Sequence, residues 1–348
     1  MKIAIDGIKD KVKSAGARLR VKDDDYIYVS SYLHAVEEKG LSSSLISRML
    51  DAESAAAAES ILKDAFHKDS AEAACDAAVE IMFDTVADCI DEPSLFDFLR
   101  YQYDANNIKT ALKCAARGIS AEDMMFSCGV VNAGTILSAA ESGNFENLPE
   151  WMASSAARAR EEFAKTGDPQ EIDLPVDRAC LEAMAVGAAA TGDKFIKDAL
   201  ALRIDMVNIL TSERVRRMSL SIAEGLLSES LSSFGNISRD MLVMSVCSHK
   251  ESGDDDMPLA TAVSERYPVI SELMRSKPTL SALERMTENE YLNFVSAGVN
   301  ETLYGIGIPF AYIVGTEYNA KNARIIIAGK RSGMSSDSIK ERMRISYV

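Results

Sequence analysis

The feature that most constrains this chain is a short pattern, Asp-x-x-Asn-Ile-x-Thr, which occurs twice at an offset of 101 residues. It runs from Asp104 to Thr110 and again from Asp205 to Thr211. A third version, Asn-Ala-Lys-Asn-Ala-Arg, begins at Asn319, 114 residues after Asp205. Residues three apart lie on one face of an α-helix, so each version places two polar side chains beside an aliphatic stripe. The recurrence predicts three similar helical units.

We expect these polar pairs to have a structural role, because each pair can hydrogen-bond the backbone end of a neighbouring helix and fix the register of a bundle. The alternative is a metal or acid–base site. Pairs about a hundred residues apart do not favour such a site, and Asn319 replaces the acid in the third. We therefore predict no catalytic, cofactor or metal-binding residues. The predicted structural repeat motif consists of Asp104, Asn107, Asp205, Asn208, Asn319, Asn322, Arg324, Gly118 and Gly333.

Apolar residues recur every three or four positions between residues 95 and 115, which predicts a helix. Gly118 can adopt the left-handed conformation that ends this helix, and Ser120 can cap the next one. The same order, Gly, an aliphatic residue and Ser, occurs at residues 40–42 and 333–335. A repeated helix-turn-helix unit is expected.

Composition favours an all-α fold, because Ala, Leu, Met, Glu and Lys are abundant and prolines number only eight. Residues 26–30 have strand-like side chains, but a lone strand would have no partner, so we interpret them as the start of a helix. The two longest uncharged runs, 124–140 and 302–316, are shorter than the roughly 20 apolar residues that cross a bilayer. We interpret both as buried core helices, with no membrane span.

The length of 348 residues exceeds the roughly 250 to 300 residues at which a single core stops growing. Together with the three motif copies, this predicts three helical bundle repeats. The repeats are expected to span residues 1–118, 119–222 and 223–348. Loops between helices are expected at residues 142–150, 166–177 and 251–258, which are polar or contain proline.

The formal net charge of −15 repels phosphate backbones and anionic lipid headgroups, so nucleic acid and a bare membrane surface are poor partners. The first 16 residues are charged and lack the apolar core of a signal peptide, which predicts a protein that is not secreted. The six cysteines form no CxxC pair and the three histidines are isolated in sequence. Neither disulfides nor a zinc site is expected.

Sequence motifs of common catalytic sites are absent. The Gly329-Lys330 pair lacks the upstream glycine and the following Ser or Thr of a phosphate-binding loop, and there is no G-x-S-x-G or H-E-x-x-H. The acidic clusters at 23–25 and 254–256 are more typical of solvated runs than of a D-D-x-x-D enzyme site. Trp151 is expected to be buried against its own domain, with an interface anchor as the alternative.

The segment from Pro309 to Lys330, with Asn-Ala-Arg at 322–324 and a further glycine at 333, resembles the ending of the V/A-type ATPase C/d subunit family. Residues 103–109 resemble the Tyr-Asp-x-x-Asn-aliphatic-Lys helix of that family, and residues 26–35 resemble its first helix more weakly. Two features depart from the family pattern: Tyr32 and His34 replace arginines of the first helix, and Asn319 replaces a common acid.

The resemblance implies a funnel of three similar helical bundles around a pseudo-three-fold axis. It implies a non-catalytic central-stalk subunit, without an active site or cofactor, on the cytoplasmic face of the membrane rotor ring. Its implied partners are the rotor ring subunits and the central shaft subunits, and its implied role is to couple them for proton or sodium transport. A free-standing helical-repeat adaptor would also explain the composition and repeats, but not the C-terminal pattern.

Overall fold

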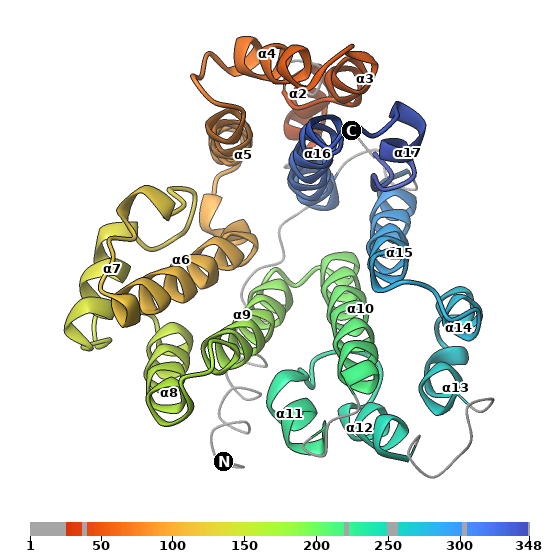
Figure 1. The fold of residues 1–348 in the computed structure, drawn as a ribbon. Coiled ribbons are helices and arrows are strands. Elements are labelled where there is room, and N and C mark those ends of the chain that lie inside the picture. Colours follow the sequence, from red (N-terminus) through yellow and green to blue (C-terminus); the bar gives the residue numbers. More distant parts are fainter. Residues whose placement is uncertain (1–25, 37–39, 219–222, 249–256, 301–304, 347–348) are drawn as a thin grey trace. The chain divides into compact units, whose positions relative to one another are not determined.

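The structure is a computed structural model, and it describes residues 26–36, 40–218, 223–248, 257–300 and 305–346. Within these ranges every element of regular structure is a helix (Figure 1), which confirms the all-α prediction. The elements are α2 (Ile27–Val36), α3 (Ser43–Asp51), α4 (Ala55–Phe66), α5 (Ala71–Ala87), η3 (Pro93–Phe96), α6 (Asp97–Arg117), η4 (Glu122–Met124), α7 (Ala133–Ser142), α8 (Glu150–Thr166), α9 (Gln170–Ala190), α10 (Lys194–Met218), α11 (Ala223–Ser230), α12 (Arg239–Ser248), α13 (Pro258–Ser264), α14 (Pro268–Arg275), α15 (Leu280–Asn300), α16 (Gly307–Arg331) and α17 (Ser336–Lys340).

The described residues form two compact units. Unit 1 contains residues 95–287, from α6 to the first part of α15. Unit 2 contains residues 26–94 and 288–346, so it is built from both ends of the chain. The division into three repeats remains a prediction.

In unit 1, α6 packs against α7 and α9, and α10 packs against α9, α11 and α12. The apolar stripe expected between residues 95 and 115 faces inward, with Leu99 and Ile108 almost fully buried. On α10, Ile204 and Ile209 have no exposed surface. These two helices therefore supply much of the core of unit 1.

In unit 2, α16 packs against α2, α3, α4, α5 and α17. Every residue from Ile308 to Thr316 is buried. The described part of the 302–316 run is thus a buried core helix from Gly307 on, as predicted. Residues 27–30 form the start of α2 and Tyr26 directly precedes it in a 3-10 conformation, which confirms the interpretation of this segment as the start of a helix.

Local sequence explains where the helices of unit 2 begin. Ser42, Ser54 and Ser70 precede α3, α4 and α5, and the hydroxyl of each accepts a hydrogen bond from the backbone N–H three residues later. This side-chain cap satisfies a donor that the first turn of a helix leaves unpaired.

The prediction that an α-helix begins directly after Ser120 is wrong. Only a 3-10 helix, η4, follows, and the next α-helix, α7, begins at Ala133. Residues 125–131 are therefore not the first part of a core helix, although they are uncharged. Their backbone groups bond instead to polar side chains of α6, as described below, and so have no need of helical partners.

The predicted loop at 142–150 is confirmed, but the loop at 166–177 is shorter than expected. Helix α9 begins at Gln170 and contains Pro175. Pro175 is the sixth residue of α9, so the Glu171 carbonyl lacks the N–H donor that another residue at position 175 would supply. The loop expected at 251–258 and the acidic clusters at 23–25 and 254–256 lie wholly or largely outside the described residues. No helix in the described part of the chain is long and apolar enough to span a bilayer.

Candidate functional site

The first motif pair lies on α6 and binds the loop that leads into α7. The Asn107 carboxamide holds both backbone groups of Phe126: Nδ2 donates to its carbonyl at 2.8 Å, and its N–H donates to Oδ1 at 2.7 Å. The Asp104 carboxylate accepts the backbone N–H groups of Val130 and Val131, both at 3.1 Å. Asp104 and Asn107 have no exposed surface. The two side chains thus satisfy backbone N–H and carbonyl groups of the loop that would otherwise need a helical or a water partner.

The second pair, on α10, makes the same contacts with the loop before α12. Asn208 Nδ2 donates to the Ser232 carbonyl at 2.9 Å, and the Ser232 N–H donates to Oδ1 at 3.1 Å. Asp205 accepts the backbone N–H groups of Asn236 and Ile237, each at 3.0 Å. Asp205 also accepts from the Asn236 side chain at 3.1 Å and from the Tyr267 hydroxyl at 2.5 Å.

The third pair, on α16, keeps the asparagine contact and changes the other. Asn322 Nδ2 donates to the Arg344 carbonyl at 3.0 Å, and the Arg344 N–H donates to Oδ1 at 2.9 Å. Asn319 donates to the Leu41 carbonyl at 2.8 Å and accepts from the Ser346 hydroxyl at 2.9 Å. We call α6, α10 and α16 the motif helices, and each two-way bond of an asparagine to one backbone residue an asparagine clamp.

The loops of the first two copies share a register that sequence reasoning missed. The aspartate partners lie four and five residues after the clamped residue in both copies, and a glycine, Gly129 or Gly235, lies three residues after it. A Cβ atom on either glycine would lie 2.3 or 2.2 Å from the aspartate Oδ1. The available signal was the shared order Ser-x-Gly-x-aliphatic in residues 127–131 and 233–237.

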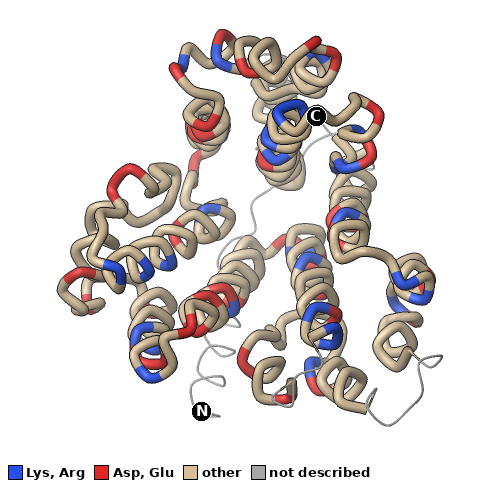
Figure 2. Tube along the Cα trace, in the orientation of Figure 1, with Lys and Arg blue, Asp and Glu red and all other residues tan. Residues whose placement is uncertain are grey.

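Acids one helical turn apart form a second repeated feature. On α5 they are Glu72 and Asp76, and on α9 they are Asp173 and Asp177. Each pair stands 32 and 28 residues before the first aspartate of the motif helix that follows. In Figure 2 both helices carry red acidic positions.

These acids bind bases of a motif helix from a different copy. In both cases the base lies five residues after the first motif residue. Lys109 of α6 pairs with an acid of α9, and Arg324 of α16 pairs with the acids of α5. The ion pairs are Lys109–Asp177, Lys113–Asp173, Arg324–Glu72 and Arg324–Asp76. All are partly exposed, and such pairs contribute about 0 to 1 kcal/mol each, so they favour correct pairing more than stability.

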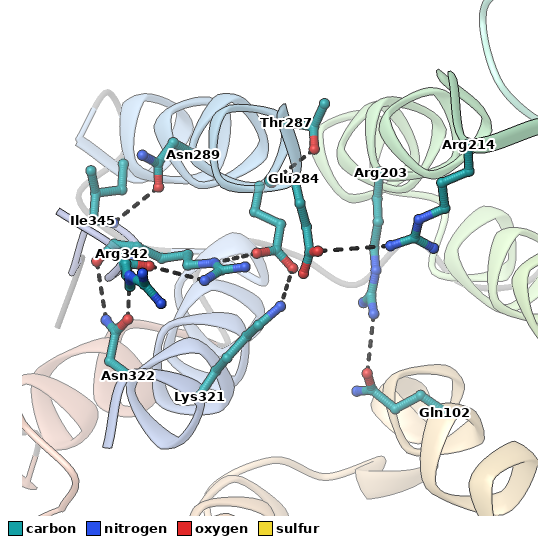
Figure 3. Close-up of polar contacts among 12 residues, drawn as sticks. Gln102, Arg203, Arg214, Glu284, Thr287, Asn289, Lys321, Asn322, Arg342 and Ile345 are labelled. Atoms are coloured by element: carbon teal, nitrogen blue, oxygen red, sulfur yellow. Dashed lines mark hydrogen bonds and ion pairs between the residues drawn. The ribbon is translucent and has the colours of Figure 1, made fainter. Parts of the chain in front are cut away.

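Helix α15 carries a third acid pair, Glu284 and Glu288. Figure 3 shows Glu284 facing Arg214. Glu284 lies 3.7 Å from Arg214 of α10. Helix α10 has Leu210 at the position that is basic in the other motif helices. Glu288 is bound instead by Lys321 and Arg344 of unit 2.

Gly118 and Gly333 both adopt left-handed conformations, with φ of 66° and 70°. Gly118 follows α6 and its N–H bonds to the last turn, and Gly333 follows α16 and does the same. Glycine adopts this conformation without the cost that a Cβ would bring.

The polar side chains of this site are engaged in hydrogen bonds, and the buried thiols near them are poorly reactive. Burial raises the pKa of the Cys75 and Cys180 thiols to about 12, which keeps both protonated and poorly nucleophilic at neutral pH. Among the described residues, no cluster of three or more His, Cys, Asp or Glu side chains is placed to hold a metal ion. The arrangement joins a helix to a distant loop through buried polar contacts.

Burial raises the pKa of the Asp104 carboxyl to about 6, against the lowering effect of the Val131 and Val130 N–H groups and of Arg100. Because the folded pKa exceeds the unfolded value, this group stabilises the fold fully below pH 3.8, and the contribution is lost as pH rises through 6. Relative to Asp104→Asn, the free energy of unfolding of the unchanged chain is expected to be about 2 kcal/mol larger, and the fold therefore more stable, at pH 4.5 than at pH 7.

Urea unfolding of both chains over that pH range measures this difference. Asp123→Asn, a change at an exposed carboxylate of the same unit, serves as the control. If the difference between Asp104→Asn and the unchanged chain is independent of pH, the Asp104 carboxyl does not have the raised pKa.

Comparison with known proteins agrees with these repeated features. A family model described as ATP synthase (C/AC39) subunit matches residues 29–342, a range that contains all three motif pairs. The chain is similar to the C subunit of the V-type sodium ATPase of Enterococcus hirae, with 23% identity over 267 residues. That similarity covers 76% of this chain and 79% of the relative.

Proposed function

Because the chain belongs to the ATP synthase (C/AC39) subunit family, we propose that it is the non-catalytic central-stalk subunit of a rotary V/A-type ATP synthase or ATPase. In this role it sits on the cytoplasmic face of the membrane rotor ring, peripheral to the membrane. Its partners are the rotor ring subunits and the central shaft subunits. It transmits rotation between them and so couples ATP chemistry to proton or sodium transport.

The observation that best supports this role is the set of three asparagine clamps on α6, α10 and α16. Transmission of torque requires a spacer that does not yield, and the clamps tie each motif helix to backbone that lies 19 to 24 residues along the chain in the described loops. Buried, fully bonded polar contacts of this kind fix one arrangement of packed helices. In this proposal the repeats 1–118, 119–222 and 223–348 form three similar bundles around a pseudo-three-fold axis.

Co-purification from gently solubilised membranes of the source organism tests the assignment. The tagged chain is expected to recover rotor ring and central shaft subunits together. Recovery of the chain with no ATPase subunit would overturn the proposal and favour a free-standing helical-repeat adaptor, the alternative that its composition and repeats also allow.

A weakened clamp is expected to reduce coupling. Asn208→Ala leaves the buried N–H and carbonyl of Ser232 without their partners, which costs about 2 to 3 kcal/mol. In the assembled complex, ion transport per ATP hydrolysed is expected to fall while ATP hydrolysis continues. Transport by membrane vesicles and ATPase activity are measured on the same preparation.

Asn106→Ala is the matched control for this experiment, because Asn106 is the half-buried neighbour of clamp residue Asn107. It is expected to leave the ratio of transport to hydrolysis unchanged. An unchanged ratio with Asn208→Ala in an intact complex would argue against a coupling role for the clamps.

A further inference from the structure

The third motif pair contacts both ends of the chain. Its asparagine clamp holds Arg344, near the C-terminus, whereas Asn319 bonds to the carbonyl of Leu41, which directly precedes the α3 cap residue Ser42. Both sets of contacts lie within unit 2. In the first two copies, one continuous loop supplies all the backbone partners of a pair.

The position of Leu41 matches that of the loop residues bound by the other two pairs. Val131 precedes Asn132, the cap of α7, and Ile237 precedes Ser238, whose carbonyl accepts the first bond of α12. In each copy the first motif residue therefore bonds to the backbone of the aliphatic residue one position before a helix cap. Helix α3 stands in the same relation to α16 as α7 does to α6.

The C-terminal helices also hold the other end of α3. The Lys330 ammonium donates to the Ala52 carbonyl at 2.5 Å, and the Ser336 hydroxyl donates to the Leu50 carbonyl at 3.1 Å. These donors satisfy carbonyl groups that a helix C-terminus leaves unpaired. Contacts from α16 and α17 thus reach both ends of α3 without using residues 341–346.

The identity of residue 319 follows from the group it faces. Asp104 and Asp205 face backbone N–H groups, which a carboxylate accepts. Residue 319 faces a backbone carbonyl at Leu41, to which it must donate, and it accepts a hydrogen bond from the Ser346 hydroxyl. An asparagine side chain does both, whereas a carboxylate accepts only.

Residues 341–346, which follow α17, make their own contacts with α15 and α16. The Arg344 guanidinium pairs with Glu288, and Ser346 donates to Asn319. The Ile345 N–H donates to Asn289 Oδ1 at 3.0 Å (Figure 3). We call these residues the strap. Apart from the Ser346 bond to Asn319, the contacts just named involve neither α3 nor the residues of α16 and α17 that bond to its two ends.

We use motif module for a motif helix together with the backbone residues that its motif pair binds and the capped helix that follows one of them. We propose that the third motif module is split between the two ends of the chain, with α3 completing it, and that the strap is a separable part of it. In the first two modules the clamped residue and the capped helix are covalently continuous, so neither is released alone. In the third, release of the strap leaves Asn319 bonded to Leu41 and α3 in place. The inference concerns unit 2 alone and does not depend on the proposed function.

Hydrogen exchange of the full-length chain tests the two halves of the module separately. The same change, asparagine to aspartate, is made in one variant at residue 319 and in another at residue 322. Asn319→Asp replaces the donor to Leu41 with a carboxylate, and amide protection in residues 45–51 of α3 is expected to fall by about tenfold or more. Asn322→Asp removes only the donor to Arg344. It is expected to reduce protection of Arg344 and Ile345 and to leave α3 within about twofold of the unchanged chain.

Deletion of residues 344–348 gives a second measurement. Protection of α3 is expected to be retained, while amides around residues 288–292 of α15 exchange several times faster. Loss of α3 protection in this deletion or in Asn322→Asp would show that the strap is not separable. Retained α3 protection in Asn319→Asp would show that α3 does not depend on the motif residue.

Discussion

Replacement of Gly129 or Gly235 by alanine is expected to destabilise unit 1 by about 3 to 5 kcal/mol, far more than a typical change of glycine to alanine. The added methyl would lie 2.3 Å from Asp104 Oδ1 or 2.2 Å from Asp205 Oδ1, well inside contact distance. Each carboxylate is fully buried and accepts hydrogen bonds from the loop that carries the glycine, so relief of the clash breaks hydrogen bonds to a buried charge.

Thermal and urea unfolding of the purified chain measure this loss, and Gly225→Ala is the matched control. Gly225 lies in α11, and apart from its chain neighbours and the nearby backbone of its own helix no atom lies within 4 Å of the position that an added methyl would occupy. Alanine is also the better helix former by about 1 kcal/mol, so we expect Gly225→Ala to be neutral or stabilising. Equal effects at all three glycines would mean that the carboxylates do not require the close approach of the loops.

Replacement of Asp205 by alanine is expected to cost about 5 kcal/mol. Its carboxylate accepts hydrogen bonds from the Asn236 and Ile237 N–H groups, from the Asn236 side chain and from the Tyr267 hydroxyl. Alanine leaves the buried Ile237 N–H and Tyr267 hydroxyl without their acceptor, and each unpaired buried group costs about 1 to 3 kcal/mol. The donors of the exposed Asn236 lose the same acceptor but can bond to water.

A double-mutant cycle with Tyr267→Phe separates the contributions at this site. The phenylalanine change alone is expected to cost about 2 kcal/mol, because it removes a hydrogen bond to a charged acceptor. After Asp205→Ala it should cost less, because the hydroxyl then has no acceptor to lose. Additive effects would exclude the Tyr267–Asp205 bond as a source of stability.

The positions of the motif pairs were predictable from sequence, whereas their partners were not. Spacing alone placed Asp104 and Asn107 on one helix face. The prediction that such pairs bond the end of a neighbouring helix remains untested as a statement about bundle register. The observed partners of the asparagines are Phe126, Ser232 and Arg344, which lie in segments outside the α-helices. A clamp recognises backbone N–H and carbonyl groups, which every residue other than proline carries, so no side-chain pattern identifies Phe126 or Ser232 as the partner.

The uncharged segment before α7 shows why composition misleads at such sites. Residues 125–131 contain apolar side chains and no charge, which favoured a buried helix. Backbone groups of Phe126, Val130 and Val131 are instead bonded by Asn107 and Asp104 of the preceding α-helix, so the usual link between low polarity and regular structure does not hold there. The acid pairs on α5 and α9 were, in contrast, visible in the sequence as a constant spacing from the motif.

The asparagine clamps also bear on how far the sequence can diverge. The three clamped residues are Phe126, Ser232 and Arg344, which have nothing in common beyond their main chain. Selection on the clamp therefore acts on one residue of each interacting pair and leaves the other free to drift. Relatives are expected to vary widely at the clamped positions and little at the asparagines, which lets a shared architecture persist at low overall identity.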